Sequence, residues 1–228
     1  MNDSSDGKGH RERLRRRFIR TGIQSFSDHE LVELLLTLAI PRRDVKKPAK
    51  ALIARYRNLR GILDASREEL QEVKGLGKVA PVALKLIRET ANLYLQQQLE
   101  SKPILNSSEG LETFWRSRLG GMRHEVFEVA FLDGGYRLLP DGIQRMQEGT
   151  VDRAAVYPRR IIEETLRKGA AAIVLAHNHT NSNVTPSEQD KIITQAIVQA
   201  AMSVQIKIVD HLIIADQNVF SFRQAGLL

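Results

Sequence analysis

The chain has 228 residues, a formal net charge of +7 at pH 7 and no cysteine. Any metal must therefore be bound through histidine and carboxylates, because a disulfide framework and thiolate-ligated zinc or iron–sulfur sites are excluded. The longest apolar runs, at 34–40 and 170–176, are far shorter than the roughly 20 residues of a membrane span. The polar, acidic start predicts no signal peptide, so we expect an intracellular, cytoplasmic protein.

The excess positive charge lies in the first part of the chain. Residues 1–100 hold 20 Lys and Arg against 13 Asp and Glu, whereas residues 101–228 hold 14 of each. The two charge regimes meet just after the short glutamine run at 96–98. We therefore predict two domains, a basic one at 1–100 and a second one at 101–228.

The first hundred residues predict an all-helical domain. Arginines crowd a first helix at 10–20, and Ser27 and Ser66 each precede a glutamate by three residues, which is the spacing of a capping box. The Ser27 helix is expected to end at Pro41. A further helix is predicted at 45–56, and a long one ends near Leu95.

A tight turn at 74–78 lies between two of these helices and resembles the hairpin of a helix-hairpin-helix module. Two glycines allow the turn and leave amide N–H groups at the start of the next helix, where the helix dipole favours an anion. We predict nonspecific contact with the DNA backbone through Lys74, Gly75, Gly77 and Lys78, to which the arginines at 10–20 could add. The alternative is a structural or protein-interaction module with solvated lysines.

Residues 101–228 predict a mixed α/β fold. Alternating and continuous apolar runs predict strands at 124–133, 136–146, 170–176, 205–215 and 219–222, with a helix at 158–168. Thr185 is expected to cap a second helix, with Pro186 at its first position and Glu188 closing the capping box. The order β-β-α-β-α-β predicts a mixed α/β sandwich.

The histidines that follow the buried strand are the predicted centre of the chemistry. In an extended chain His177 and His179 point to the same side, so both imidazoles can reach one ion, and Asp190 follows in the second turn of the next helix. Two imidazoles and one carboxylate suit Zn²⁺ with one position left for water, whose pKa zinc lowers from about 15.7 to about 7. Ser187 shares a helix face with Asp190, and Glu125 is the candidate proton shuttle.

Alternatives remain open for these residues. The two histidines could form a polar loop after a core strand, with Asp190 on the helix surface and Glu125 an outward residue beside an exposed Glu128. Asp210 and His211 could orient a ligand from behind, or they could form a satisfied pair at the end of a strand.

The pattern His-x-His-x₁₀-Asp, with a serine three residues before the aspartate and an upstream glutamate, resembles the JAMM (MPN-plus) metallohydrolase motif. The surrounding sequence is similar to the RadC family in particular, at 123–127, 149–151, 157–159, 185–190 and 210–213. RadC-like proteins also carry a helix-hairpin-helix-type region before this domain, so the resemblance spans nearly the whole chain. The family usually has Pro-Ser-Gly after the second histidine, whereas this chain has Thr180-Asn181-Ser182.

The resemblance implies a cytidine-deaminase-like sandwich and a zinc hydrolase related to isopeptidases that cut ubiquitin-like conjugates. It implies His177, His179 and Asp190 as zinc ligands, Glu125 as general base and acid, and Ser187 as a stabiliser of the oxyanion. We therefore predict a zinc-dependent metallopeptidase or isopeptidase that acts on a protein or peptide.

The alternative from a different class is a DNA-binding adaptor of DNA repair or recombination, in which the JAMM fold is a non-catalytic scaffold. A metal-dependent nuclease would unite both halves of the chain. A single carboxylate among the ligands, however, fits a one-zinc amide hydrolase better than a two-metal phosphodiesterase.

Overall fold

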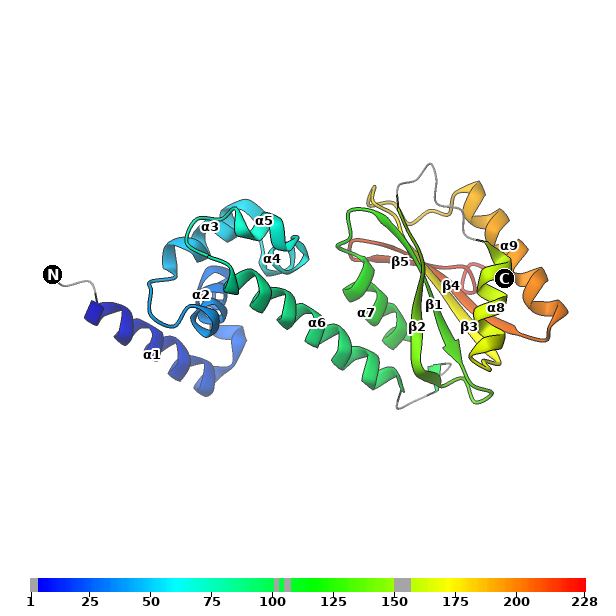
Figure 1. Cartoon of the computed structure of the whole chain (residues 1–228), viewed down its shortest axis with the longest axis horizontal. Coiled ribbons are helices and arrows are strands. Elements are labelled where there is room, and N and C mark those ends of the chain that lie inside the picture. Colours follow the sequence, from blue (N-terminus) through cyan, green and yellow to red (C-terminus); the bar gives the residue numbers. More distant parts are fainter. Residues whose placement is uncertain (1–3, 101–102, 105–107, 150–156) are drawn as a thin grey trace. The chain divides into compact units, whose positions relative to one another are not determined.

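The computed structural model of the chain describes residues 4–100, 103–104, 108–149 and 157–228. The chain divides into two compact units, Met1–Ala91 and Asn92–Leu228. The first unit is helical and the second holds a mixed sheet with helices (Figure 1), which confirms the predicted fold class. Among the described residues, no helix combines the length and the apolar character that a membrane crossing requires.

Side-chain caps mark the start of several helices of the first unit. They are α1 (Ser4–Thr21), α2 (Asp28–Ala39), α3 (Lys46–Tyr56), α4 (Leu59–Asp64), α5 (Arg67–Gln71) and the start of α6 (Val79–Glu100), with a 3₁₀ turn η1 (Ile23–Ser25). Both predicted capping boxes are confirmed, with the amides of Ser27 and Ser66 donating to Glu30 and Glu69 at 3.0 and 2.9 Å. The bond from the Ser27 amide lowers the pKa of Glu30 to about 2. Helix α4 had no sequence prediction; Asn58 caps it by accepting a hydrogen bond from the Gly61 amide at 2.8 Å.

A buried side chain anchors the hairpin before α6 to the core of the first unit. Leu76 is 1% exposed within the core of this unit, while Lys74 and Lys78 on either side of it are exposed. Gly75 has a φ of 96°, and a Cβ there would lie 3.0 Å from Pro48 Cγ of α3. The position therefore requires glycine both for its left-handed backbone and for its close approach to Pro48.

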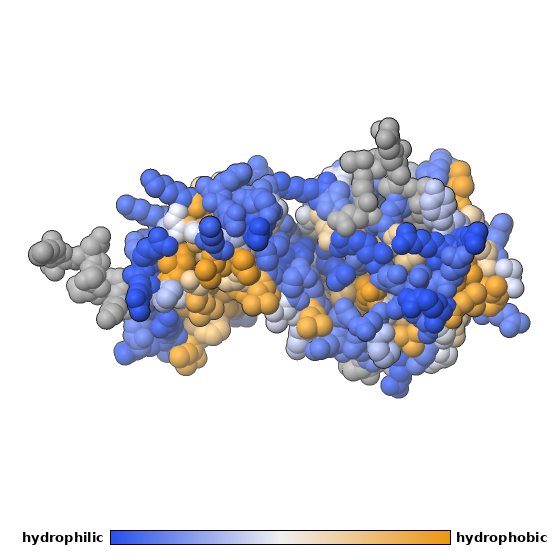
Figure 2. All heavy atoms as spheres, viewed as in Figure 1, coloured by the Kyte–Doolittle hydropathy of each residue, from blue (hydrophilic) through white to orange (hydrophobic). Residues whose placement is uncertain are grey.

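The first unit also exposes apolar side chains. Figure 2 shows them gathered on its visible face among hydrophilic ones. Ile19, Leu38 and Val79 are 83%, 69% and 64% exposed. Surface of this kind is typical of interaction sites, so the protein-interaction alternative for this unit stays open beside DNA contact.

The second unit is one five-stranded sheet between two helical layers. Its elements are α7 (Ser108–Leu119), β1 (Glu125–Leu132), β2 (Leu138–Gly149), α8 (Pro158–Arg167), β3 (Ala172–Asn178), α9 (Glu188–Ser203), β4 (Lys207–Ala215) and β5 (Asn218–Ser221). The strand order is β2-β1-β3-β4-β5, and the β3–β4 pair is parallel while the others are antiparallel. Helix α7 had no sequence prediction.

Side chains of the central strands alternate between the two helical layers. Trp115 of α7 belongs to one core cluster with Ala130 and Val174, whereas Ile197 of α9 belongs to another with Val129 and Leu175. Figure 1 shows α7 on one side of the sheet and α8 and α9 on the other. Odd-numbered residues of β1 and β3 therefore face α9.

Glu128 is buried, and the expectation that it is exposed was wrong. It is 0% exposed on the α7 side of β1. Arg118 donates to it at 2.7 Å and the Trp115 indole at 3.3 Å, and Arg145 Nε lies 3.5 Å away. The alternating pattern misled because β1 is covered on both faces, so each polar residue along it needs a partner inside the protein.

Candidate metal centre

The three predicted ligand residues lie together at the carboxyl end of β3. The Nε2 atoms of His177 and His179 are 3.1 Å apart. They lie 3.1 and 3.3 Å from the two carboxylate oxygens of Asp190. The candidate ligand atoms are all within 4.8 Å of one another, which is the spacing of donors that can share one ion.

The sheet places both histidines. Strand β3 begins and ends two residues later than the sequence predicted, so it includes His177 and Asn178, and His177 is only 7% exposed. The amide of His179 still pairs with Ile214 of β4 at 2.9 Å. The ring of His179 donates from Nδ1 to the carbonyl of Asn183 at 2.7 Å, so Nε2 is the ring nitrogen that faces Asp190.

Helix α9 begins two residues later than predicted. Ser187, not Thr185, is the N-cap, and Asp190 closes the capping box in the first turn. The amide and hydroxyl of Ser187 donate to Asp190 Oδ2 at 2.7 and 2.6 Å. Thr185 instead donates its amide to the Asn183 side chain at 2.9 Å. The box fixes the Asp190 carboxylate where the positive end of the helix dipole favours it.

The electrostatics of the cluster favour a cation. Burial opposes the charge on Asp190, but hydrogen bonds from His177 and His179 outweigh it and hold the pKa of the carboxyl far below its usual range. The hydrogen bond to Asp190 in turn raises the pKa of His179. A carboxylate that favours a proton on His179 also favours a divalent ion beside it. Two imidazole nitrogens and a carboxylate oxygen fit Zn²⁺.

Glu125 lies beside this cluster at the start of β1. The antiparallel register places Phe127 opposite His177, and continuing that register places Glu125 opposite His179. Side chains on opposite positions share a face, so Glu125 is on the α9 side with the two histidines. Its charge also helps to raise the pKa of His179.

Asn178, which the sequence analysis left without a role, fixes the backbone on both sides of Glu125. Its Oδ1 accepts from the amide of Val126 at 2.8 Å, and its Nδ2 donates to the carbonyl of His124 at 3.0 Å. The residue between the two histidines thus joins the end of β3 to the start of β1. No local signal in the sequence reveals these two hydrogen bonds, because their partners lie 52 and 54 residues apart in the chain.

The neighbouring residues Asp210 and His211 contact different parts of the structure. His211 is fully buried, and its Nε2 lies 2.8 Å from His177 Nδ1. Burial holds the pKa of His211 well below its usual value, which favours the neutral ring. Asp210 instead accepts from the Ser221 hydroxyl at 2.6 Å and the Arg223 amide at 3.0 Å. Only His211 therefore contacts the cluster.

The loop that departs from the family pattern is held by its own side chains. Asn181 Oδ1 accepts from the amide of Asn183 at 3.2 Å, and the Ser182 hydroxyl donates to Asp216 at 2.5 Å. Ser182 has a φ of 58°, a conformation uncommon outside glycine. Thr150 and Val151 of the 149–151 segment lie outside the described residues.

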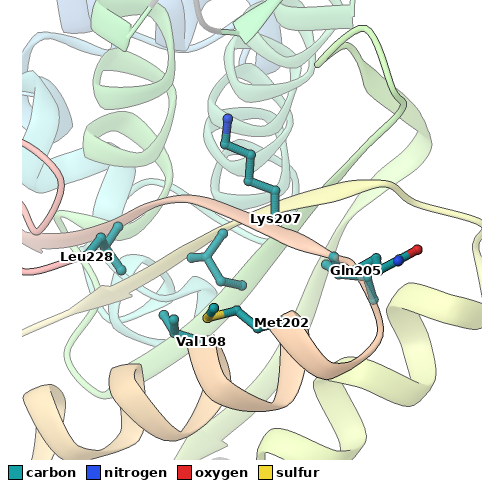
Figure 3. A pocket seen from close by; sticks show the side chains of 7 residues that line it. Val198, Met202, Gln205, Lys207 and Leu228 are labelled. Carbon is teal, nitrogen blue, oxygen red and sulfur yellow. The ribbon is translucent and has the colours of Figure 1, made fainter.

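A separate hollow of about 380 Å³ lies between the end of α9 and the start of β4, lined in part by Val198, Met202 and Leu228 (Figure 3). Lys207 at this hollow pairs with Ala172, at the amino end of β3, whereas His177 lies at the carboxyl end. The hollow is therefore distinct from the candidate metal centre.

Comparison with known proteins covers both units. The protein-family model of the RadC-like JAB domain matches residues 105–227. The family model of the UPF0758 N-terminal region matches residues 9–82. A UPF0758 protein of Fusobacterium nucleatum is 34% identical over 98% of each chain. UPF0758 proteins of Paraburkholderia xenovorans and Pseudoalteromonas translucida are 35% and 34% identical, covering 93% and 95% of this chain and 83% and 96% of their own.

Proposed function

The chain belongs to the RadC-like JAB family, with a UPF0758 N-terminal region, and from this membership we propose that it is a zinc-dependent metallopeptidase or isopeptidase. One observation carries the proposal. The Nε2 atoms of His177 and His179 converge on the Asp190 carboxylate, and Glu125 lies on the same face of the sheet. This set supplies both a metal site and a separate proton acceptor.

Each residue has one task in the proposed reaction. When bound, zinc supplies a Lewis acid that makes water acidic enough to react near neutral pH. His177, His179 and Asp190 hold the ion. Glu125 takes a proton from the attacking water and returns it to the leaving amine. Asn178 keeps Glu125 in place through the backbone bonds on either side of it.

Ser187 is the proposed donor to the oxyanion. Its hydroxyl donates to Asp190 Oδ2 at 2.6 Å, so it lies next to a candidate ligand atom. With a cation held at Asp190, the Ser187 hydroxyl would be able to turn from the carboxylate and donate to a developing negative charge.

We expect the zinc-loaded chain to hydrolyse amide bonds in a mixed library of peptides and isopeptide-linked conjugates, with the products identified by mass spectrometry. Removing zinc with a chelator should abolish the cleavage, because water is then no longer activated. Adding zinc back should restore it. Cleavage that survives chelation would contradict the proposal, as would the absence of any product from the zinc-loaded chain.

A second proposal is that the first unit contacts the DNA backbone. The net charge of +7 falls entirely within residues 1–100, and the exposed Lys74 and Lys78 border the hairpin that opens α6. On α1, a hollow of about 650 Å³ is lined by Arg13, Arg16, Arg17 and Arg20, among other residues. The hairpin lysines and the α1 arginines each supply positive charge suited to phosphates.

Binding of the full chain to duplex DNA should weaken steeply as salt is raised, because phosphate contacts release counterions. Changing Lys74 and Lys78 to Gln should reduce the slope of log affinity against log salt by about one for each lysine. The matched control changes Lys47 and Lys50 of α3, which removes the same charge from another exposed site. Absence of binding even at low salt would refute this second proposal.

A further inference from the structure

Behind the metal centre, hydrogen bonds lead from Asp190 through α9 and β4 to His177. The Thr194 hydroxyl lies 2.5 Å from the main-chain carbonyl of Asp190, one turn earlier on α9. The same hydroxyl lies 2.6 Å from Nδ1 of His211. Nε2 of His211 lies 2.8 Å from Nδ1 of His177. Thr194 and His211 are both 0% exposed, so water does not compete for these bonds.

The chemistry of the groups fixes the direction of every bond. A carbonyl oxygen carries no proton, so Thr194 must donate its only hydroxyl proton to Asp190. Toward His211, Thr194 can then only accept, and Nδ1 of His211 must carry a proton. Within the part of the chain that the structure describes, no carboxylate hydrogen-bonds to the His211 ring, which packs against Phe127 and Phe222 with ring centroids 5.5 and 4.7 Å away. Such an apolar surrounding favours the neutral ring, whose Nε2 is then an acceptor.

The consequence falls on His177. Because Nε2 of His211 accepts, Nδ1 of His177 must donate, and the lone pair of a neutral His177 ring is left on Nε2. That atom is the one 3.1 Å from Asp190 Oδ1. Phe127 stacks on the His177 ring at 5.9 Å with an 8° interplanar angle, which sets the plane of the ring but not its tautomer. His179 needs no such support, because Asn183 accepts from its Nδ1.

We infer that Thr194 and His211 are positioning residues, which hold His177 in the Nδ1–H tautomer so that its Nε2 can bind a divalent cation of the zinc type together with His179 and Asp190. The inference rests on the metal site of the proposed function and goes beyond it. Asp190 takes part at both ends, with its main-chain carbonyl anchoring Thr194 and its carboxylate facing His177. The bonds therefore tie the strand that carries one ligand to the helix that carries another.

The substitutions that test this inference are Thr194→Val, Thr194→Ser and Thr165→Val. Valine keeps the shape of threonine but removes the hydroxyl, whereas serine keeps the hydroxyl. Thr165 is the matched control, because it is also 0% exposed and also donates to a carbonyl one turn earlier, that of Ile161 at 2.7 Å, but on α8. Thermal unfolding of each variant shows whether it folds.

Zinc affinity, measured by competition with a chromophoric chelator, should fall about 10–100-fold in Thr194→Val, as for other partners that orient a metal ligand. It should be near the wild-type value in Thr194→Ser and Thr165→Val. Equal affinity in Thr194→Val and Thr165→Val would overturn the inference while leaving the proposed function standing. A wild-type chain that binds no zinc would overturn both.

The direction of the bonds has its own test that needs no metal. Nitrogen NMR of the metal-free wild-type chain should find the His211 proton on Nδ1 and none on Nε2. A proton on Nε2 would mean that His211 donates to His177, and the inference would then fail even if every threonine variant behaved as expected.

Discussion

The Glu125→Gln variant should keep its zinc and its fold while its rate of amide hydrolysis falls by about 10²–10⁴-fold, the usual contribution of a general acid–base group. Glutamine has nearly the same shape as glutamate but cannot accept a proton from water. The backbone bonds that Asn178 makes to Val126 and His124 do not involve the Glu125 side chain, so they should persist. The substitution therefore separates proton transfer from metal binding.

The matched control is Glu188→Gln. Glu188 is the first residue of α9, its side chain is 83% exposed, and it pairs only with Lys191 among the contacts described. Its loss removes the same charge near the site without removing a group on the β1 side of the cluster. If the Glu125→Gln variant hydrolyses substrate at the wild-type rate, Glu125 is not the proton shuttle. Loss of zinc together with activity would make Glu125 a ligand instead.

The Asp190→Asn variant should lose zinc affinity by more than the roughly 10–100-fold that removal of an orienting partner costs, because it removes the charged member of the candidate ligand set. Asparagine can still accept one hydrogen bond from Ser187, so α9 should keep most of its capping. The expected loss of stability in the metal-free chain is therefore modest, within the about 0.5–2 kcal/mol of a lost cap.

Zinc competition and chemical unfolding of the metal-free variant measure these two effects separately. Glu188→Gln again serves as the control, since it changes a neighbouring carboxylate in the first turn of α9. Unchanged zinc affinity in Asp190→Asn would show that this carboxylate is not a ligand. A collapse of folding without metal would show that the residue is mainly structural.

Local sequence signals were enough for much of the fold and for the three residues that converge at the end of β3. The capping boxes at Ser27 and Ser66 depend only on residues three positions apart, and both form. The start of α9 was misplaced because Thr185 and Ser187 each precede an acidic residue by three positions. Packing decides between them, since the box at Ser187 is the one that aims Asp190 at the histidines.

Other features depend on contacts that a linear pattern does not carry. His211 approaches His177 because β4 pairs in parallel with β3, where Leu175 is opposite His211. Glu128 is buried because Arg118 reaches it from α7. Helix α7 itself left a readable signal, since Leu111, Phe114, Trp115 and Leu119 have helical spacing and are all buried.

The measurement that tests the central claim most directly is the zinc content of the chain after purification without added metal and dialysis against zinc at a fixed free concentration. The wild-type chain and a His29→Ala control, altered in the first turn of α2 in the other unit, should each retain about one zinc per chain, the number held by a site of this ligand type. The double variant His177→Ala/His179→Ala should retain none. The same zinc content in the double variant as in the wild type would contradict the assignment of the metal centre and the hydrolase proposed from it.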